Sequence, residues 1–180
     1  MVSHESAEPP PGMIGDGCGY QPGMTTTHAV PSPIGLAGFG VAAAAAALIG
    51  GLGVAGTAAE YQSLEQPSWA PPSWLFGPVW TVLYVLIAVS GWLFWRTGAP
   101  RREFGWYAAG LVLNAAWTPL FFAAGAYTLA LVEIVVLDVV IAATALVFRR
   151  RSTAAAALQL PYLAWTLFAT VLNTAIVVLN

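Results

Sequence analysis

Two aromatic side chains four residues apart could hold a flat ligand. Trp80 and Tyr84 share one face if their segment is helical, and Trp80 lies nearly two turns inside the predicted helix. Stacking on an indole contributes about 0.5–1.5 kcal/mol beyond the burial of area. The pair therefore predicts an inward stacking surface, with an aromatic belt at the membrane surface as the alternative.

Two further segments combine polar and aromatic residues on one face. Asn114 and Thr118 are four residues apart, and Phe121 lies on the next turn of the same face. An Asn amide within lipid is costly unless it bonds to a partner or a ligand. In the last apolar segment Trp165 and Ala169 share a face, with a small residue beside a large one. These faces predict the walls of a binding pocket.

The residues between the first two apolar segments are rich in proline and tryptophan. Pro67, Pro71 and Pro72 stiffen this loop and prevent a continuous helix. Trp69 and Trp74 suit either a membrane-surface belt or a lid over a pocket. Both interpretations stay open at this point.

Two acids, Glu133 and Asp138, lie inside the fourth apolar segment. At roughly 100° per residue they face directions about 140° apart, so they do not form a carboxylate pair. Acids within lipid are expensive and indicate function by default. Each either bonds a neighbouring hydroxyl or amide, or couples a proton or substrate.

The sequence offers no nucleophile beside a base and no metal site, so we assign no catalytic residue and no metal ligand. His4, His28 and Cys18 all precede the first apolar segment. Axial ligation of haem iron by His or Cys is therefore unavailable in the predicted bundle, and no cofactor is required.

Composition identifies the setting in which these residues act. The 180 residues are 58% hydrophobic and 8% charged, whereas soluble domains carry roughly 25% charged residues. So few charges could not cover the surface of a water-soluble fold. The net charge of −2 gives no case for nucleic acid. The chain is therefore predicted to be an integral membrane protein in contact with lipid.

Five apolar stretches are each near the roughly 20 residues that cross a bilayer. Lipid offers no partner for a free backbone amide, so each must be a helix. We predict an all-α bundle of five transmembrane helices over residues 34–180, preceded by a disordered Pro- and Gly-rich tail over 1–33. The predicted helices are Ile34–Ala59, Trp74–Trp95, Phe104–Phe122, Thr128–Phe148 and Thr153–Leu179. In the first, Gly38, Ala42, Ala46 and Gly50 predict a smooth packing stripe.

All six basic residues are arginines, and they fall in two predicted loops. Three lie between the second and third helices and three between the fourth and fifth, at positions 96, 101, 102, 149, 150 and 151. With five helices both loops face the same side, which the positive-inside rule makes cytoplasmic together with the N-terminus. The absence of lysine and the abundance of alanine indicate a bacterial source, and so the bacterial cytoplasmic membrane.

Three blocks of residues resemble the translocator protein family, also called the tryptophan-rich sensory protein or peripheral-type benzodiazepine receptor family. The blocks occur in family order and at family spacing. They are Pro67-x-Trp69-x-Pro71-Pro72 with Phe76-x-Pro78-Val79-Trp80-x-x-Leu83-Tyr84; Leu113-Asn114-x-x-Trp117 with Phe121-Phe122; and Pro161-Tyr162-Leu163-x-Trp165-x-x-Phe168-Ala169-x-x-Leu172-Asn173.

The resemblance implies a five-helix bundle, often a homodimer, with a ligand pocket that opens toward the first loop. Family ligands are porphyrins and other tetrapyrroles, sterols in some members, and synthetic aromatic drugs. The ligand-binding residues that it implies are Tyr61, Pro71, Trp80, Tyr84, Asn114, Thr118, Phe121, Trp165 and Ala169.

Three functions follow from this resemblance and from the residues. The first is a protein that binds porphyrin, or haem without a strong axial bond, in order to sense, sequester or transport it. The second is an enzyme that degrades porphyrin in light, since Trp80 and Trp165 match tryptophans implicated in that reaction in some members. The third is a small proton-coupled transporter that uses Glu133. Its weakness is the lack of an inverted repeat.

Overall fold

The computed structural model describes residues 33–54 and 58–180, and among these it contains helices and loops but no strand. The predicted disordered tail lies outside the described residues, except for Pro33, which begins the first helix. The helical elements are α1 (Pro33–Val54), α2 (Ala58–Ser63), η1 (Ser73–Leu75), α3 (Phe76–Trp95), η2 (Arg101–Phe104), α4 (Gly105–Thr118), η3 (Pro119–Ala123), α5 (Tyr127–Arg149), α6 (Thr153–Ala157) and α7 (Leu160–Leu179).

Four stretches of the described chain are long and apolar enough to cross a membrane, which agrees with an all-α membrane fold. They are Pro33–Val54, Ser73–Trp95, Tyr127–Arg149 and Thr153–Leu179. The remaining predicted span is divided, because α4 has 14 residues and continues as the five-residue π-helix η3. A proline has no N–H and its ring crowds the preceding turn, so the widened turn begins at Pro119. The count of five spans stays a prediction.

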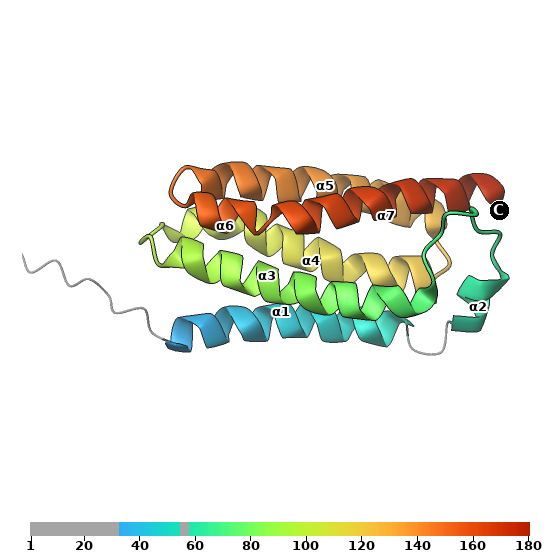
Figure 1. Ribbon diagram of the computed structural model, residues 1–180, viewed down its shortest axis with the longest axis horizontal. Helices are drawn as coiled ribbons and strands as arrows, with labels where there is room; N and C mark the ends of the chain where they lie inside the picture. The colour runs from blue at the N-terminus through green and yellow to red at the C-terminus, as the bar shows by residue number, and fades with distance from the viewer. Residues whose placement is uncertain (1–32, 55–57) are drawn as a thin grey trace, which may run out of the picture.

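The long helices lie side by side along the long axis of the molecule (Figure 1). The start of α1 and the loops 96–104 and 149–152 lie at one end, on the left of Figure 1. We call this the arginine end, since all six arginines belong to those two loops and their flanking turns. Helix α2, the loop that follows it and Asn180 lie at the opposite end.

The last predicted helix is broken near Pro161. Helix α6 ends at Ala157, and α7 begins at Leu160 with the proline in its first turn. A proline is tolerated there because it removes an N–H that would have no helical partner. The break brings the buried side chain of Gln159 to α3, where its Nε2 donates to the Ser90 hydroxyl at 2.9 Å.

The predicted packing stripe of α1 is wrong in its first half. Gly38 and Ala42 are exposed, whereas the buried face carries Ala43, Ala46, Gly50 and Gly53. Each step of four residues rotates the position by roughly 40° around a helix of 3.6 residues per turn. Residues that are always four apart therefore move gradually off the contact face. The buried residues are alternately three and four apart, which keeps them on that face.

Aromatic rings fill the interior at the arginine end. The rings of Phe94 and Phe148 are stacked with their centroids 3.9 Å apart, and neither side chain is exposed. Phe104 packs edge-on against Phe94, with ring centroids 5.1 Å apart. Gly91 makes room for this cluster, because a Cβ there would lie 2.7 Å from Phe39 and 2.8 Å from Tyr107. These contacts leave the opposite half of the bundle as the place for a cavity.

Candidate ligand-binding cavity

A cavity of about 520 Å³ lies in the half of the bundle away from the arginine end. Its walls come from α1, α2, η1, α3, α4, η3, α5 and α7. Its volume falls within the range of small-molecule sites, which is roughly 300–1,000 Å³. Eight of the nine predicted binding residues line it, namely Tyr61, Trp80, Tyr84, Asn114, Thr118, Phe121, Trp165 and Ala169.

Aromatic rings from several helices face this cavity. On α3 the rings of Trp80 and Tyr84 lie 5.5 Å apart, as the spacing of four residues predicts. Trp165 on α7 packs edge-on against Phe76, with ring centroids 5.9 Å apart. The rings of Trp117 and Phe121 are stacked at 5.1 Å. The walls can therefore contact a flat apolar ligand from several sides.

One polar pair lies deep in the cavity wall. The Tyr84 hydroxyl donates to Oδ1 of the buried Asn114 at 2.6 Å, which is the partner that the Asn amide requires within lipid. Gly50 of α1 faces this pair, because a Cβ there would lie 3.3 Å from Oγ1 of Thr118 and 3.8 Å from the Tyr84 hydroxyl. The pair can orient a ligand that carries a polar edge.

The loop of residues 64–72, which we call the cap loop, follows α2 at the end of the bundle opposite the arginine end. Pro71 in this loop does not line the cavity. The backbone is extended at Pro72 and then turns into η1, so Ser73 reaches the cavity wall instead. Tyr61 of α2 does line the cavity, and burial raises the pKa of its hydroxyl.

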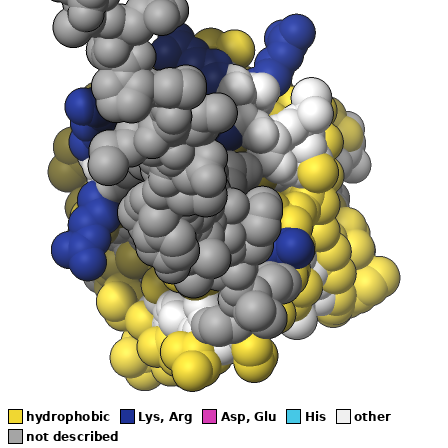
Figure 2. All heavy atoms as spheres, turned by 90° about the vertical axis from the view of Figure 1, so that its left-hand side faces the viewer, with side chains coloured by type: hydrophobic (Ala, Val, Ile, Leu, Met, Phe, Trp, Pro, Cys, Tyr) yellow, Lys and Arg dark blue, Asp and Glu magenta, His cyan; other side chains and the backbone are white. Residues whose placement is uncertain are grey.

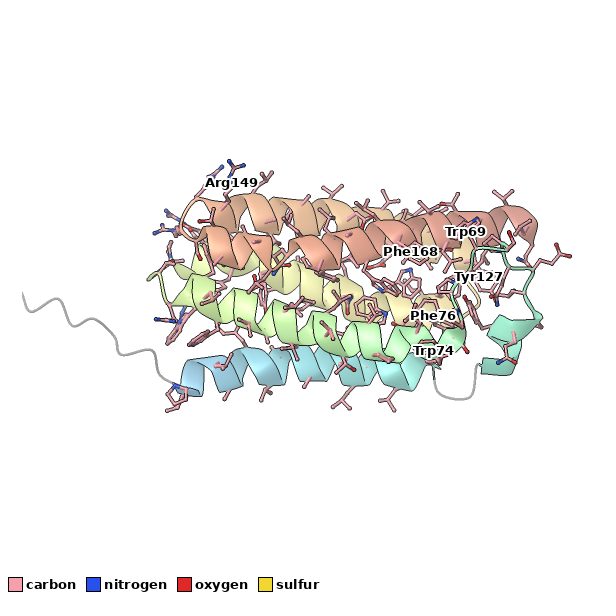
Figure 3. All side chains as sticks on the ribbon, in the orientation of Figure 1. Trp69, Trp74, Phe76, Tyr127, Arg149 and Phe168 are labelled. Carbon is pink, nitrogen blue, oxygen red and sulfur yellow. The ribbon has the colours of Figure 1, made fainter. Side chains whose placement is uncertain are left out.

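The two tryptophans of this region behave differently. Trp69 packs edge-on against Phe168 of α7, with ring centroids 6.0 Å apart (Figure 3). Trp74 is 70% exposed and lies outside the cavity. The exposure of Trp74 fits the membrane-surface belt. Trp69 does not line the cavity either, and for this residue the lid and the belt both stay predictions.

The cap loop is also tied to the end of α7. The Glu65 N–H donates to Oδ1 of Asn180 at 3.0 Å, and Nδ2 of Asn180 donates to the Glu65 carbonyl at 3.1 Å. Nδ2 of Asn180 also donates to the Ile176 carbonyl at 2.9 Å, which fixes the amide on its own helix. The cap loop thus has one aromatic and one polar attachment to α7.

Comparison with known proteins identifies the family. Residues 39–179 match the TspO/MBR family. The chain belongs to this family. It is 42% identical over 118 residues to a translocator protein of Ovis aries, an alignment that covers 63% of the chain and 70% of the sheep protein.

Microbial members of the TspO/MBR family are similar at comparable levels. The chain is 40% identical over 122 residues to the tryptophan-rich protein TspO of Archaeoglobus fulgidus, covering 67% of the chain and 79% of that protein. It is 36% identical over 113 residues to the tryptophan-rich sensory protein of Cereibacter sphaeroides, covering 63% of the chain and 72% of that protein. Family membership and the apolar helices make the chain an integral membrane protein.

Of the two acids of α5, Asp138 belongs to the buried face and Glu133 is partly buried, and neither lines the cavity. Asp138 accepts a hydrogen bond at 2.8 Å from the Thr170 hydroxyl of α7, as expected for an acid that bonds a neighbouring hydroxyl. Both carboxyl oxygens of Glu133 are buried without a hydrogen-bond partner among the described residues. A proton-coupling role for Glu133 would therefore have to act outside the cavity wall.

Sequence reasoning missed the contribution of α1. Ala47, Gly50, Gly51 and Val54 all line the cavity, although none has a side chain that suggests a site. The adjacent glycines were the available signal, since they leave space beside the larger residues of α3 and α4. Phe76, Trp117 and Asn173 also line the cavity. They belong to the family blocks but were not assigned to the pocket.

Proposed function

We propose that this TspO/MBR family protein binds a porphyrin-type tetrapyrrole in its cavity and acts as a sensor, sequestering protein or transporter of that ligand. The observation that carries the proposal is the set of aromatic rings around one apolar cavity with the Tyr84–Asn114 pair in its wall. A porphyrin has two flat apolar faces and a polar edge. Aromatic walls match the faces, and the polar pair matches the edge.

The lining residues favour a metal-free porphyrin, or haem held without a strong axial bond. They include no His and no Cys, which are common axial ligands of haem iron. Recognition would then depend on ring stacking and shape, with few polar contacts to select the substituents.

Titration of the purified full-length protein with protoporphyrin tests this proposal. We expect saturable quenching of tryptophan emission, since Trp80 and Trp165 line the cavity. The matched comparison is an acyclic apolar ligand of similar mass, which lacks the rigid flat face. Equal affinity for both ligands, or no saturation with protoporphyrin, would overturn the proposal.

A second candidate uses the same cavity as a site where light degrades the porphyrin. The specific observation in its favour is that Trp80 and Trp165 both line the cavity. The titration is therefore repeated in darkness and in light, with and without air. Binding without loss of the porphyrin absorbance supports the first candidate. Loss of that absorbance that needs both the protein and light supports the second.

We further propose five spans with a cytoplasmic N-terminus in a bacterial cytoplasmic membrane, and assembly as a homodimer. The arrangement in Figure 1 supports this topology, because the start of α1 and both arginine loops share one end. Reporter fusions near Gly98 and at Asn180 should lie on opposite sides of the membrane. Reporters on the same side would contradict the five-span topology, and cross-linking in membranes tests the dimer.

A further inference from the structure

The arginine end carries a strong excess of positive charge. The two arginine loops contain six arginines and one acid, Glu103. Figure 2 views this end and shows dark blue side chains around its rim, with no magenta on the visible described surface. The ligand cavity uses none of these residues. The charge at this end therefore takes no part in the cavity.

One ion pair joins the two arginine loops. Nε of Arg151 donates to one carboxylate oxygen of Glu103 at 2.7 Å, and its terminal nitrogen donates to the other at 2.8 Å. A bidentate pair of this kind fixes orientation as well as distance. It holds the turn before α4 against the turn after α5.

Two more arginines adjoin this ion pair in the sequence. Arg102 precedes Glu103 and Arg150 precedes Arg151, and both are exposed. The hydrogen bond from Arg151 is the main reason that the pKa of Glu103 is lowered, and the charges of Arg102 and Arg150 lower it further. Arg151 is engaged by Glu103, whereas Arg102 and Arg150 are exposed cations next to the pair.

The neighbouring aromatic residues indicate the depth of this end in a membrane. Trp95 is 40% exposed and Trp106 is 48% exposed, at the end of α3 and the start of α4. The guanidinium of Arg96 lies 4.8 Å from the ring centroid of Trp92. Exposed tryptophans beside basic residues at helix ends are typical of the lipid headgroup region.

We propose that the arginine end binds the headgroups of anionic phospholipids, with Arg102 and Arg150 as the principal phosphate contacts beside the Arg151–Glu103 pair. A guanidinium binds a phosphate through two parallel hydrogen bonds, and its pairing with Glu103 keeps Arg151 from competing for the same headgroup. The tryptophan belt favours a lipid over a soluble anion, because it places the cations at headgroup depth. Each exposed arginine should raise the affinity for an anionic lipid about five-fold.

Native mass spectrometry of the purified full-length protein in neutral detergent tests this proposal. The protein is titrated with phosphatidylglycerol and with phosphatidylcholine of the same acyl chains. We expect preferential retention of the anionic lipid, decreasing as salt rises. The double variant Arg102→Gln/Arg150→Gln should bind phosphatidylglycerol about 25-fold more weakly, with phosphatidylcholine unchanged.

Two controls make the result decisive. Arg102→Lys/Arg150→Lys keeps the charge but loses the two parallel hydrogen bonds, so it should keep an intermediate preference, even if the glutamine variant is poorly folded. An equal preference in the wild type and the glutamine variant would overturn the assignment, as would equal retention of the two lipids. Displacement of phosphatidylglycerol by glycerol phosphate at equal concentration would show a free-anion site instead and would also overturn it.

Discussion

The two halves of the bundle use the same kind of residue in opposite ways. At the arginine end, Phe94, Phe104 and Phe148 contact one another and fill the interior. At the other end, Trp80 and Trp165 lie around a cavity. Aromatic content alone therefore does not distinguish a core from a binding site.

The loops at the two ends of the bundle are also held by different kinds of contact. At the arginine end, a bidentate ion pair between Arg151 and Glu103 joins two loops above a filled core. At the cavity end, Asn180 and the backbone of Glu65 form two exposed hydrogen bonds. The arginine end is therefore held by a charged pair over packed rings, and the cavity end by neutral, exposed hydrogen bonds.

The largest expected effect comes from Phe148→Ala in the packed half. Phe148 has no exposed surface and stacks on Phe94, so its truncation leaves a void that the neighbouring rings cannot fill. Because lipid is itself apolar, we expect the lower part of the usual range, about 3 kcal/mol of unfolding free energy. Unfolding in mixed micelles measures it. Trp165→Ala, at the cavity wall, should cost clearly less stability, and an equal loss would contradict the comparison between the halves.

The next largest effect concerns the affinity of the cavity half for protoporphyrin. Trp80→Ala and Trp165→Ala should each weaken protoporphyrin binding by about 1–3 kcal/mol, by analogy with the stacking of bases on aromatic side chains. That is roughly a 5- to 150-fold loss of affinity. Fluorescence titration measures it.

Trp92→Ala and Trp95→Ala are the matched controls for those variants. Both residues lie at the arginine end of α3, away from the cavity lining. They should leave protoporphyrin affinity nearly unchanged. Equal losses in all four variants would mean that the tryptophans act through general stability, and the binding role of Trp80 and Trp165 would have to be withdrawn.

The sequence predicted the parts of this comparison that depend on local spacing. The four-residue separation of Trp80 and Tyr84 put both on one helical face, and the requirement of Asn114 for a partner is met by Tyr84. It did not predict that α1 lines the cavity, since the glycines and alanines there indicate only close packing and carry no polar or aromatic group.

Long-range geometry could not be read from the sequence in the same way. The pairing of Glu65 with Asn180 joins residues 115 positions apart, and no periodicity indicates it. The close packing of η3 on α1 is likewise long-range, since a Cβ at Gly53 would lie 2.9 Å from the Pro119 nitrogen. The failure of Pro71 to line the cavity likewise follows from the direction of the loop at Pro72.

A pair of hydroxyl deletions compares polar contacts in the two halves. Tyr84→Phe removes the hydroxyl that donates to the buried Asn114, so we expect a loss of about 1–2 kcal/mol in unfolding free energy. Tyr107→Phe in the packed half removes only a bond to the Ile87 carbonyl, which is a helix backbone group. Its loss should be about 0.5–1 kcal/mol. A larger loss for Tyr107→Phe would show that the polar contact of the cavity half is the less important one.

The smallest expected effect concerns the attachment of the cap loop. Asn180→Ala removes both hydrogen bonds to Glu65, but these groups are exposed and water replaces them, so the loss should be below about 1 kcal/mol. Trp69 still packs on Phe168, so the loop should loosen without detaching from α7. We expect protoporphyrin to dissociate roughly two- to five-fold faster, with association accelerated by a similar factor and the equilibrium affinity little changed. Stopped-flow quenching measures both rates.

Thr174→Ala is the matched control, since its exposed hydroxyl donates only to the Thr170 carbonyl of its own helix. Unchanged rates in Asn180→Ala would mean that the aromatic contact alone holds the loop, and a lower affinity with unchanged association would make Asn180 part of the binding site instead of its closure.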